Sequence, residues 1–399
     1  MNRPGLEHGA VTQPSAPFLP FHAPAIGEEE IDAVVATLRS GWLTTGARTF
    51  ELEAAMARLT GAAHAVAVSS GTAALHLALL AAGVGPGDEV IVPTFTFAAS
   101  AEAVHYTGAT PVLADVDPRT GNLQAEEVAR RLGPRTRAVM PVHLAGLPCD
   151  LDAIGDVARA GGALVIDDAA HALPARLRGR SIGALADATA FSFYATKNVT
   201  TGEGGLVTTG RGDWAERMRI LRLHGISRDA WKRYTAEGTW AYEILELGCK
   251  YNLPDVLAAI GVAQLGKLDR FVAARRTIVA RYRAALGDLD TVALPAEPPG
   301  FESAWHLFVV RLRVERLRID RGAVIEELRR AGIGTSVHFI PLHMHPYYRR
   351  TSGTAPGDFP GAEDLYRRCV SLPLYPGLTD ADVDRVTDTL RGILGRARR

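Results

Sequence analysis

The chain has 399 residues, of which 47% are hydrophobic and 22% are charged, and this balance is typical of a globular protein. Lys plus Arg equals Asp plus Glu at 44 each, so the formal net charge is zero and the basic excess of a nucleic-acid-binding protein is missing. No apolar run approaches the roughly 20 residues that cross a bilayer. We therefore expect two domains, with neither nucleic acid nor a membrane as a partner.

The first residues contain several Pro and Gly and no apolar core of signal-peptide length, so we expect a flexible leader over 1–17. The three cysteines, Cys149, Cys249 and Cys369, lie far apart and match no zinc or iron–sulfur spacing. We therefore expect no metal. An odd number of cysteines without a secretory signal favours a reducing compartment, which predicts a cytoplasmic location.

Helical patterns cover about 26–38 and 49–59. From there, short apolar runs alternate with helical segments; the runs are 65–68, 89–92, 111–114, 138–142, 163–166, 189–193 and 205–208. This alternation is typical of a parallel sheet covered by helices on both faces. It predicts a large α/β domain over 18–270, with a mostly parallel sheet between helices.

The pattern changes after about residue 251. A long helix is predicted over 252–282, followed by a Pro-rich connection at 294–300. A strand at 305–310, a helix at 321–331, a second strand and a final helix from Asp380 come next. We predict a smaller C-terminal α+β domain over 271–399.

The first chemically informative segment is Ser69-Ser70-Gly71-Thr72, which joins an apolar strand directly to a helix. The free N–H groups and the positive dipole end of a helix N-terminus suit a phosphate. Gly71 would allow close backbone approach, and Thr72 would add a hydroxyl donor. Taken alone, a plain helix cap is the commoner explanation.

The second segment is the pair Asp167 and Asp168, which closes a very apolar strand at the edge where parallel sheets bind ligands. A carboxylate at this edge can pair with a protonated pyridine nitrogen and make the ring a better electron sink. A magnesium ligand and a cap of the next helix are the two alternatives, and the pattern alone does not rank them.

The third segment holds Lys197, just past another apolar strand and close to Ser192 and Thr196, whose hydroxyls could donate to a phosphate. Desolvation would lower the pKa of Lys197 and make it a usable amine nucleophile and proton carrier. An isolated lysine after a strand is more often a solvated loop residue. Asn252, ahead of the next apolar helix, has a helix cap as its simplest role.

The order of these features favours a single explanation. Pyridoxal 5′-phosphate (PLP) requires an anion cradle, a carboxylate for its ring nitrogen and an amine for its aldehyde. Gly71 with Thr72, then Asp168, then Lys197 supply these three groups in turn. The sequence therefore predicts a PLP enzyme.

The motifs SSGTAALHLAL, GDEVIVPTFTFAA, VIDDAAHAL, FSFYATKN with EGG, KYNLPDVLAAIGVAQL and SLPLYPGLT resemble those of the DegT-type nucleotide-sugar aminotransferases, in the same order from about Phe18 to the end. Within that family, the UDP-4-amino-4-deoxy-L-arabinose–oxoglutarate aminotransferases look most similar. The resemblance implies a fold-type I PLP aminotransferase that moves the amino group of L-glutamate onto a nucleotide-linked keto-sugar, with a UDP-4-keto sugar as first choice. It also implies a homodimer with a shared active site.

Carried over residue by residue, the resemblance implies that Lys197 holds PLP as a Schiff base and that Asp168 binds the pyridine nitrogen. Asp167 falls where relatives often have Glu and is given a supporting role. His171 would approach the phenolic oxygen of the cofactor. The remaining implied sites are ring stacking by Phe97, a phosphate cradle of Gly71, Thr72 and Ser192, a contact of Asn252 with the phosphate of the neighbouring subunit, and a sugar site of His338, Tyr347 and Tyr348.

Three alternatives stay open at this point. A PLP dehydratase or lyase would share the phosphate turn and Lys197, but dehydratase relatives replace that lysine with His or add an iron–sulfur cluster, so transamination is favoured. A non-PLP phosphosugar enzyme would need Asp167 and Asp168 to hold a metal. A non-catalytic sensor of the same fold would not need the intact pair of Lys197 and Asp168. The nucleotide, the sugar and the position of amination are not determined by the sequence.

Overall fold

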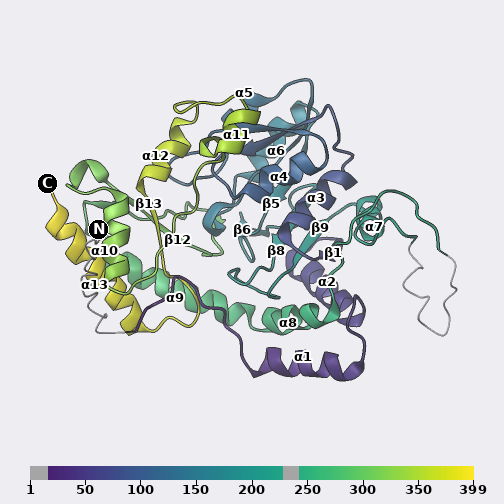
Figure 1. The fold of residues 1–399 in the computed structure, drawn as a ribbon, viewed down its shortest axis with the longest axis horizontal. Coiled ribbons are helices and arrows are strands. Elements are labelled where there is room, and N and C mark those ends of the chain that lie inside the picture. The colour runs from purple at the N-terminus through teal and green to yellow at the C-terminus, as the bar shows by residue number, and fades with distance from the viewer. Residues whose placement is uncertain (1–16, 228–241) are drawn as a thin grey trace, which may run out of the picture.

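The computed structural model describes residues 17–227 and 242–399. Its centre is a seven-stranded sheet (Figure 1) made, in spatial order, of β1 (His64–Val68), β9 (Gly205–Thr209), β8 (Ala188–Ser192), β5 (Leu164–Asp168), β4 (Thr136–Val139), β2 (Glu89–Pro93) and β3 (Thr110–Ala114). The run from β8 to β3 is parallel, which confirms the predicted mostly parallel α/β fold. β9 is antiparallel to both of its neighbours, β8 and β1.

Helices cover both faces of this sheet, and successive residues of each strand point to opposite faces. Val66 and Val68 of β1 pack with the helices of what we call the α3 face, namely α3 (Gly71–Ala81), α4 (Ala98–Tyr106) and α7 (Gly212–Leu221). Ala65 and Ala67 pack with the helices of the α2 face, namely α2 (Ala47–Thr60), α5 (Ala125–Arg131), α6 (Leu151–Ala160) and α8 (Asp255–Gly266). The same alternation places Asp168 toward the α3 face and Asp167 toward the α2 face.

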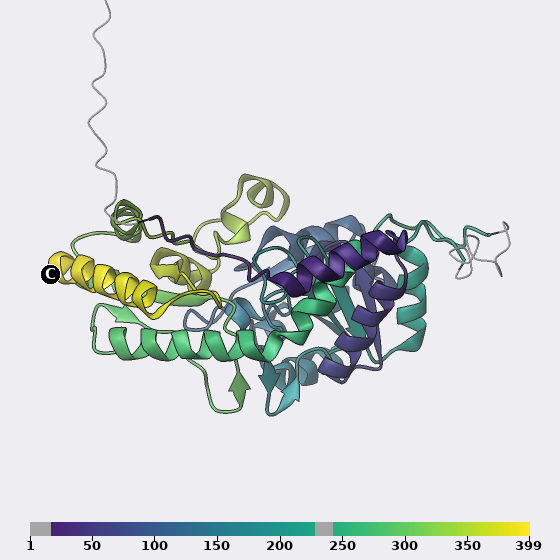
Figure 2. The ribbon, with the colours of Figure 1, turned by 90° about the horizontal axis from the view of Figure 1, so that it is seen from below.

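Two helices replace the single helix predicted over 252–282, so that prediction was wrong in this respect. α8 begins only at Asp255, because Pro254 stays extended at φ −78° and ψ 149°. α9 (Leu268–Leu286) begins after Lys267, whose ammonium lies 2.5 Å from a carboxylate oxygen of Glu30. Glu30 belongs to α1 (Glu28–Ser40), which lies along α8, while α9 extends from there into the C-terminal part of the molecule (Figure 2).

The C-terminal part has its own apolar core. It contains a three-stranded antiparallel sheet of β10 (Val292–Ala293), β12 (Phe308–Leu312) and β13 (Cys369–Leu372), covered by α9, α10 (Arg321–Arg330) and α13 (Asp380–Ala397). Two further helices, α11 (Pro346–Thr351) and α12 (Pro360–Arg368), instead contribute Tyr348 and Leu365 to the α3-face core. Leu19 packs in the C-terminal core, and the division that the sequence placed between 270 and 271 falls inside α9.

The leader predicted over 1–17 lies, except for Pro17, outside the described residues. In the described part of the chain, no helix combines the length and the apolar character needed to span a membrane.

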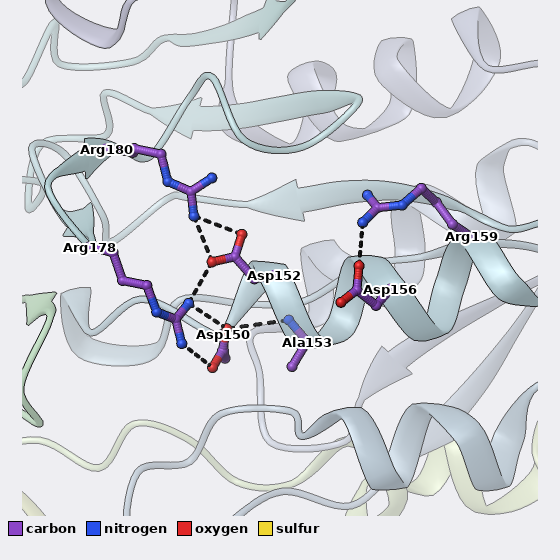
Figure 3. Close-up of polar contacts among 7 residues, drawn as sticks. All are labelled: Asp150, Asp152, Ala153, Asp156, Arg159, Arg178 and Arg180. Atoms are coloured by element: carbon purple, nitrogen blue, oxygen red, sulfur yellow. Dashed lines mark hydrogen bonds and ion pairs between the residues drawn. The ribbon is translucent and has the colours of Figure 1, made fainter.

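A short hairpin is tied to the start of α6 by ion pairs (Figure 3). It consists of β6 (Arg176–Leu177) and β7 (Arg180–Ser181), and both turn residues between them, Arg178 and Gly179, have positive φ, as a type I′ turn requires. The Arg178 guanidinium contacts Asp150 at 2.8 Å and Asp152 at 2.6 Å. β6 also pairs with β11 (Phe301–Glu302), which directly precedes the segment 303–307.

Asp255 is buried at the start of α8 and caps the neighbouring helix α2. Its carboxylate accepts the backbone N–H groups of Gly46 (2.7 Å), Arg48 (3.1 Å) and Thr49 (2.9 Å) and the hydroxyl of Thr49 (2.7 Å). Asp255→Ala leaves these donors unpaired, and we expect the free energy of unfolding to fall by about 3 kcal/mol. Denaturant unfolding at fixed protein concentration measures it.

The matched variant Asp255→Asn keeps one carbonyl oxygen for Gly46 and Thr49 and loses the oxygen that binds Arg48. We expect it to lose about half as much stability as Asp255→Ala. Equal stability of wild type and Asp255→Ala would contradict the capping role.

Candidate active site

A cavity of about 560 Å³ opens at the carboxyl ends of β5 and β8, between the large sheet and the C-terminal part. A volume of this size suits a cofactor with part of a substrate. The structure brings eight of the residues predicted from the sequence to its walls: Gly71, Thr72, Phe97, Asp168, His171, Ser192, Lys197 and His338.

The phosphate turn lies at the N-terminus of α3, where Ser70 caps the helix by accepting the N–H of Ala73 at 3.1 Å. A Cβ at Gly71 would lie 2.9 Å from the Cβ of Ser192, and a Cβ at Gly205 would lie 2.3 Å from the carbonyl oxygen of Ser70. Only glycine fits this close packing of the turn against β8 and β9. Gly71 and Thr72, the first residues of α3, line the cavity together with Ser192. The first N–H groups of a helix have no partner within it, so those of Gly71 and Thr72 are available to a phosphate.

Asp168 ends β5 and is held by two hydrogen bonds. Its Oδ2 accepts from the hydroxyl of Ser100 at 2.8 Å, and its Oδ1 accepts from the N–H of Ala170 at 3.0 Å. Burial raises the pKa of Asp168, while these hydrogen bonds and the charge of Lys197 act in the opposite direction. The carboxylate is therefore fixed in orientation and suited to pair with a cationic N–H group. Ser100 was not singled out from the sequence.

Lys197 follows β8 in a tight turn, in which its N–H donates to the carbonyl of Tyr194 at 2.9 Å. Burial lowers the pKa of the Lys197 ammonium to about 8, and the carboxylate of Asp168 opposes this shift. With this pKa, roughly a tenth of the amine is unprotonated at pH 7, and this is the form that attacks a carbonyl carbon.

His171 is a neutral hydrogen-bond donor in the cavity. The N–H of Ala145 donates to its Nδ1 at 3.3 Å, so the ring carries its proton on Nε2. Burial, together with the charges of Lys197 and His338, holds the pKa of His171 well below its usual value. Phe97, at the start of α4, is 62% exposed, and this open ring face suits stacking on a flat ligand, worth about 1 kcal/mol.

Three predicted site residues do not line the cavity. Asn252 pairs with Val68 at the end of β1, and its amide donates to the hydroxyl of Thr45 at 2.9 Å; it does not cap α8, which Pro254 precedes. Tyr348 is buried in the α3-face core, and Tyr347 is partly exposed beside it. The roles inferred for these residues stay predictions.

Several cavity residues were not singled out from the sequence. Phe21 and His22 come from the segment ahead of α1, which crosses the C-terminal part before it reaches the large domain. His306 and Phe339 come from the C-terminal part, and Glu203 comes from the loop before β9. Their positions depend on contacts between segments far apart in the chain, and His306 lies in the strand predicted at 305–310 without a signal of its own.

Asp167 and Asp168 do not form a metal site together. Asp167 turns away from the cavity and accepts a hydrogen bond from Nε2 of His143 at 2.8 Å, whereas Asp168 faces the cavity. The Nδ1 of His143 accepts the N–H of Cys149 at 2.9 Å, which leaves the ring proton on Nε2 for Asp167. Within 17–227 and 242–399, no three or more His, Cys, Asp or Glu side chains gather as a metal-binding group. The geometry therefore gives no support to the magnesium alternative.

Residues 24–391 match the DegT/DnrJ/EryC1/StrS aminotransferase family. This chain belongs to that family. It is 47% identical over 378 residues to the spore coat polysaccharide biosynthesis protein SpsC of Bacillus subtilis, a match that covers 94% of this chain and 97% of SpsC.

Two solved structures share the fold of this chain. Spr1654 of Streptococcus pneumoniae, described as a sugar aminotransferase, superposes in its PLP form with a TM-score of 0.89 at 33% identity, over 95% of this chain and 99% of that chain. DesV of S. venezuelae superposes with a TM-score of 0.86 at 36% identity, over 96% of this chain and 100% of that chain. The predictions of fold, family and enzyme class are confirmed.

The aminotransferase uses PLP, and its cavity fits that cofactor. The turn at Gly71 offers backbone N–H groups to a phosphate, Asp168 offers a carboxylate to a ring nitrogen, and Lys197 offers an amine. When bound, PLP supplies an aldehyde that takes up amines and a ring that accepts electrons. In that reaction Lys197 Nζ would accept a proton from the substrate carbon and return it, Asp168 would hold a cationic N–H group in place, and His171 would donate from Nε2.

The pKa of Lys197 predicts how the aminotransferase captures its cofactor. Protonated Lys197 has no lone pair to attack an aldehyde, so we expect the rate of PLP capture by cofactor-free protein to rise with pH and to level off above about 8. Stopped-flow visible absorption measures this rate. A rate that keeps rising to about pH 10 would show a lysine of ordinary pKa and contradict the effect of burial.

Proposed function

We propose that the enzyme moves the amino group of L-glutamate onto a nucleotide-linked keto-sugar, with a UDP-4-keto sugar as the first choice. The observation that carries the proposal is the placement of Lys197 and Asp168 in the wall of one cavity, at the ends of neighbouring strands of the sheet. A proton carrier and a ring-nitrogen carboxylate serve both halves of a transamination. The sugar class is supported by the relatives, because SpsC is named for polysaccharide biosynthesis and Spr1654 is described as a sugar aminotransferase.

We further propose that the enzyme is a homodimer with a shared active site. Among the described residues, Lys197 is the only lysine that lines the cavity, and no arginine lines it. Both carboxylates of glutamate and the diphosphate of a nucleotide sugar would need further cations, which a second copy could supply. Phe97 and Tyr194 at the cavity are largely exposed, so a second copy could also cover apolar surface. Light scattering that gives the mass of one chain would contradict the proposal.

In this dimer, Asn252 would reach the phosphate of the neighbouring subunit, and His338, Tyr347 and Tyr348 would lie near the sugar. His338 is the best supported of these, because it lines the cavity and its Nδ1 lies 2.9 Å from the Ser371 hydroxyl. We also propose a cytoplasmic location, which is supported by the fact that Cys149, Cys249 and Cys369 are all unpaired.

The experiment that tests the function treats the PLP-loaded enzyme with L-glutamate and then with a panel of UDP-, dTDP- and GDP-linked keto-sugars. Mass spectrometry detects the amino-sugar product. We expect product from at least one UDP-linked 4-keto sugar, and none when glutamate is left out. Product from 3-keto sugars alone, or from dTDP- or GDP-linked sugars alone, would overturn the choice of substrate, and product without glutamate would overturn the choice of donor.

A further inference from the structure

His306 lies in the cavity wall on the segment 303–307, and both its backbone and its ring are held in place. The residue is 5% exposed, and its ring centroid lies 4.4 Å from that of His171. Arg275 of α9 is buried behind it and donates from Nη1 to the carbonyls of Trp305 at 3.2 Å, His306 at 3.3 Å and Leu374 at 2.8 Å. The guanidinium therefore fixes the backbone from the side away from the cavity.

Asn198, the residue after Lys197, determines which ring nitrogen of His306 carries the proton. The Nδ2 of Asn198 donates to the carbonyls of Leu173 at 2.9 Å and Ala304 at 2.8 Å. Because carbonyl oxygens only accept, the orientation of the amide is settled and its Oδ1 faces Nδ1 of His306 at 3.2 Å. This oxygen can only accept, so Nδ1 of His306 carries the proton.

The second nitrogen of His306 is therefore a free acceptor. Burial, followed by the charges of Lys197 and Arg275, holds the pKa of His306 well below its usual value, so the ring stays neutral. Within the described part of the chain, no group donates a hydrogen bond to its Nε2. His171 and His306, in contact with each other, thus have opposite tautomers: one offers an N–H from Nε2, and the other offers a lone pair from Nε2.

We propose that His306 binds the substrate directly by accepting, at Nε2, a hydrogen bond from an ammonium or hydroxyl group, with Asn198 as the residue that positions it. Most polar side-chain atoms of protein interiors have a hydrogen-bond partner, and among the described residues Nε2 of this cavity-lining histidine has none, so a ligand in the cavity can supply one. The inference deepens the proposed function and rests on it for the choice of probes, because glutamate brings an ammonium group and a sugar brings hydroxyls.

Two variants distinguish the role of His306 Nε2, which has no partner, from that of Nδ1, which donates to Asn198. His306→Asn keeps an N–H where Nδ1 donates to Asn198 and removes the Nε2 position, whereas His306→Gln extends an amide to that position. We expect His306→Asn to weaken the binding of one substrate about tenfold, which corresponds to about 1.4 kcal/mol. His306→Gln should recover most of this lost affinity. PLP affinity should be unchanged in both.

The two substrate groups are tested in separate arms. The first titrates the PLP-loaded enzyme with α-methyl-L-glutamate, which has no α-proton to lose and is read by its spectral change without turnover. The second measures the KM of UDP-4-keto-6-deoxyglucose with the aminated enzyme. Weaker binding in the first arm identifies the ammonium group as the donor to His306. A higher KM in the second arm identifies a sugar hydroxyl as the donor. No loss in either arm, or a loss of PLP affinity in step with both, overturns the proposal.

Matched controls complete the test. His76→Asn removes a similarly buried imidazole outside the cavity, which contacts the Tyr251 hydroxyl at 3.3 Å through Nδ1, and should behave as wild type. Asn198→Ala should weaken the binding of the same substrate. Adding His306→Asn to that variant should then weaken the binding little further.

A spectroscopic measurement decides the tautomer without any substrate. In ¹⁵N NMR of histidine-labelled protein at neutral pH, the signals lost in His306→Asn should report a neutral ring protonated on Nδ1. A ring protonated on Nε2 overturns the proposal. If wild type accepts neither probe, the proposed function fails, and this measurement still decides the state of His306.

Discussion

Lys197→Ala is expected to lower the rate of transamination by at least about 10⁴-fold, because it removes both the amine that holds the cofactor and the base that moves the substrate proton. The low pKa of Lys197, about 8, is what makes the amine available for both tasks. Single-turnover conversion of the PLP-loaded enzyme by L-glutamate measures the effect. The side chain lines the cavity, so the variant should fold normally and keep some affinity for PLP through the turn at Gly71.

Two controls decide whether the loss comes from the amine. Lys197→Arg keeps the positive charge but has no unprotonated form near neutral pH, so it should be as inactive as Lys197→Ala. A small amine such as methylamine in the buffer should restore part of the proton transfer in Lys197→Ala and none in Lys197→Arg, where the guanidinium fills the space. A single-turnover rate of Lys197→Ala within tenfold of that of wild type would contradict the role of Lys197 in holding the cofactor and moving the proton.

Asp168→Asn is the second substitution with a large expected effect. It removes the negative charge at the cavity while keeping a side chain that can contact Ser100 and Ala170, so the fold should be maintained. We expect kcat to fall by about 10²- to 10³-fold, the size typical of removing one preorganised electrostatic group. Steady-state kinetics at saturating substrate measure the fall.

Asp167→Asn is the matched control, because Asp167 is the neighbouring carboxylate on the opposite face of β5. It contacts His143 and not the cavity, so we expect a lower free energy of unfolding with a much smaller change in kcat. If the two variants lose kcat equally, the assignment of Asp168 as the ring-nitrogen carboxylate is contradicted.

The sequence predicted the sheet and the walls of the cavity well because local patterns determine both. Alternating apolar runs reveal parallel strands, and the ends of such strands meet at one edge, so the chain pattern alone was enough to group Gly71, Asp168 and Lys197. The residues alone also made Ser192 a candidate phosphate donor, and the family resemblance added His171 and Phe97; all three line the same cavity.

The features of the site and fold that the sequence did not predict depend on contacts that no local pattern encodes. Phe21 and His22 reach the cavity only because the segment ahead of α1 crosses the C-terminal part, where Leu19 pairs with Ile333. The tautomer of His306 depends on Asn198, which is 108 residues away in the chain. The break in the predicted helix over 252–282 lies at Lys267, whose ammonium binds Glu30 of α1, a residue far away in the chain.

The most direct test of the central claim is to reduce the purified, PLP-loaded protein with borohydride and to map the modified peptide by mass spectrometry. We predict visible absorption before reduction, its loss on reduction, and one pyridoxyl-phosphate group fixed to the peptide that contains Lys197. Bound cofactor with no label on Lys197, or a protein that stays colourless with added PLP, would contradict the account.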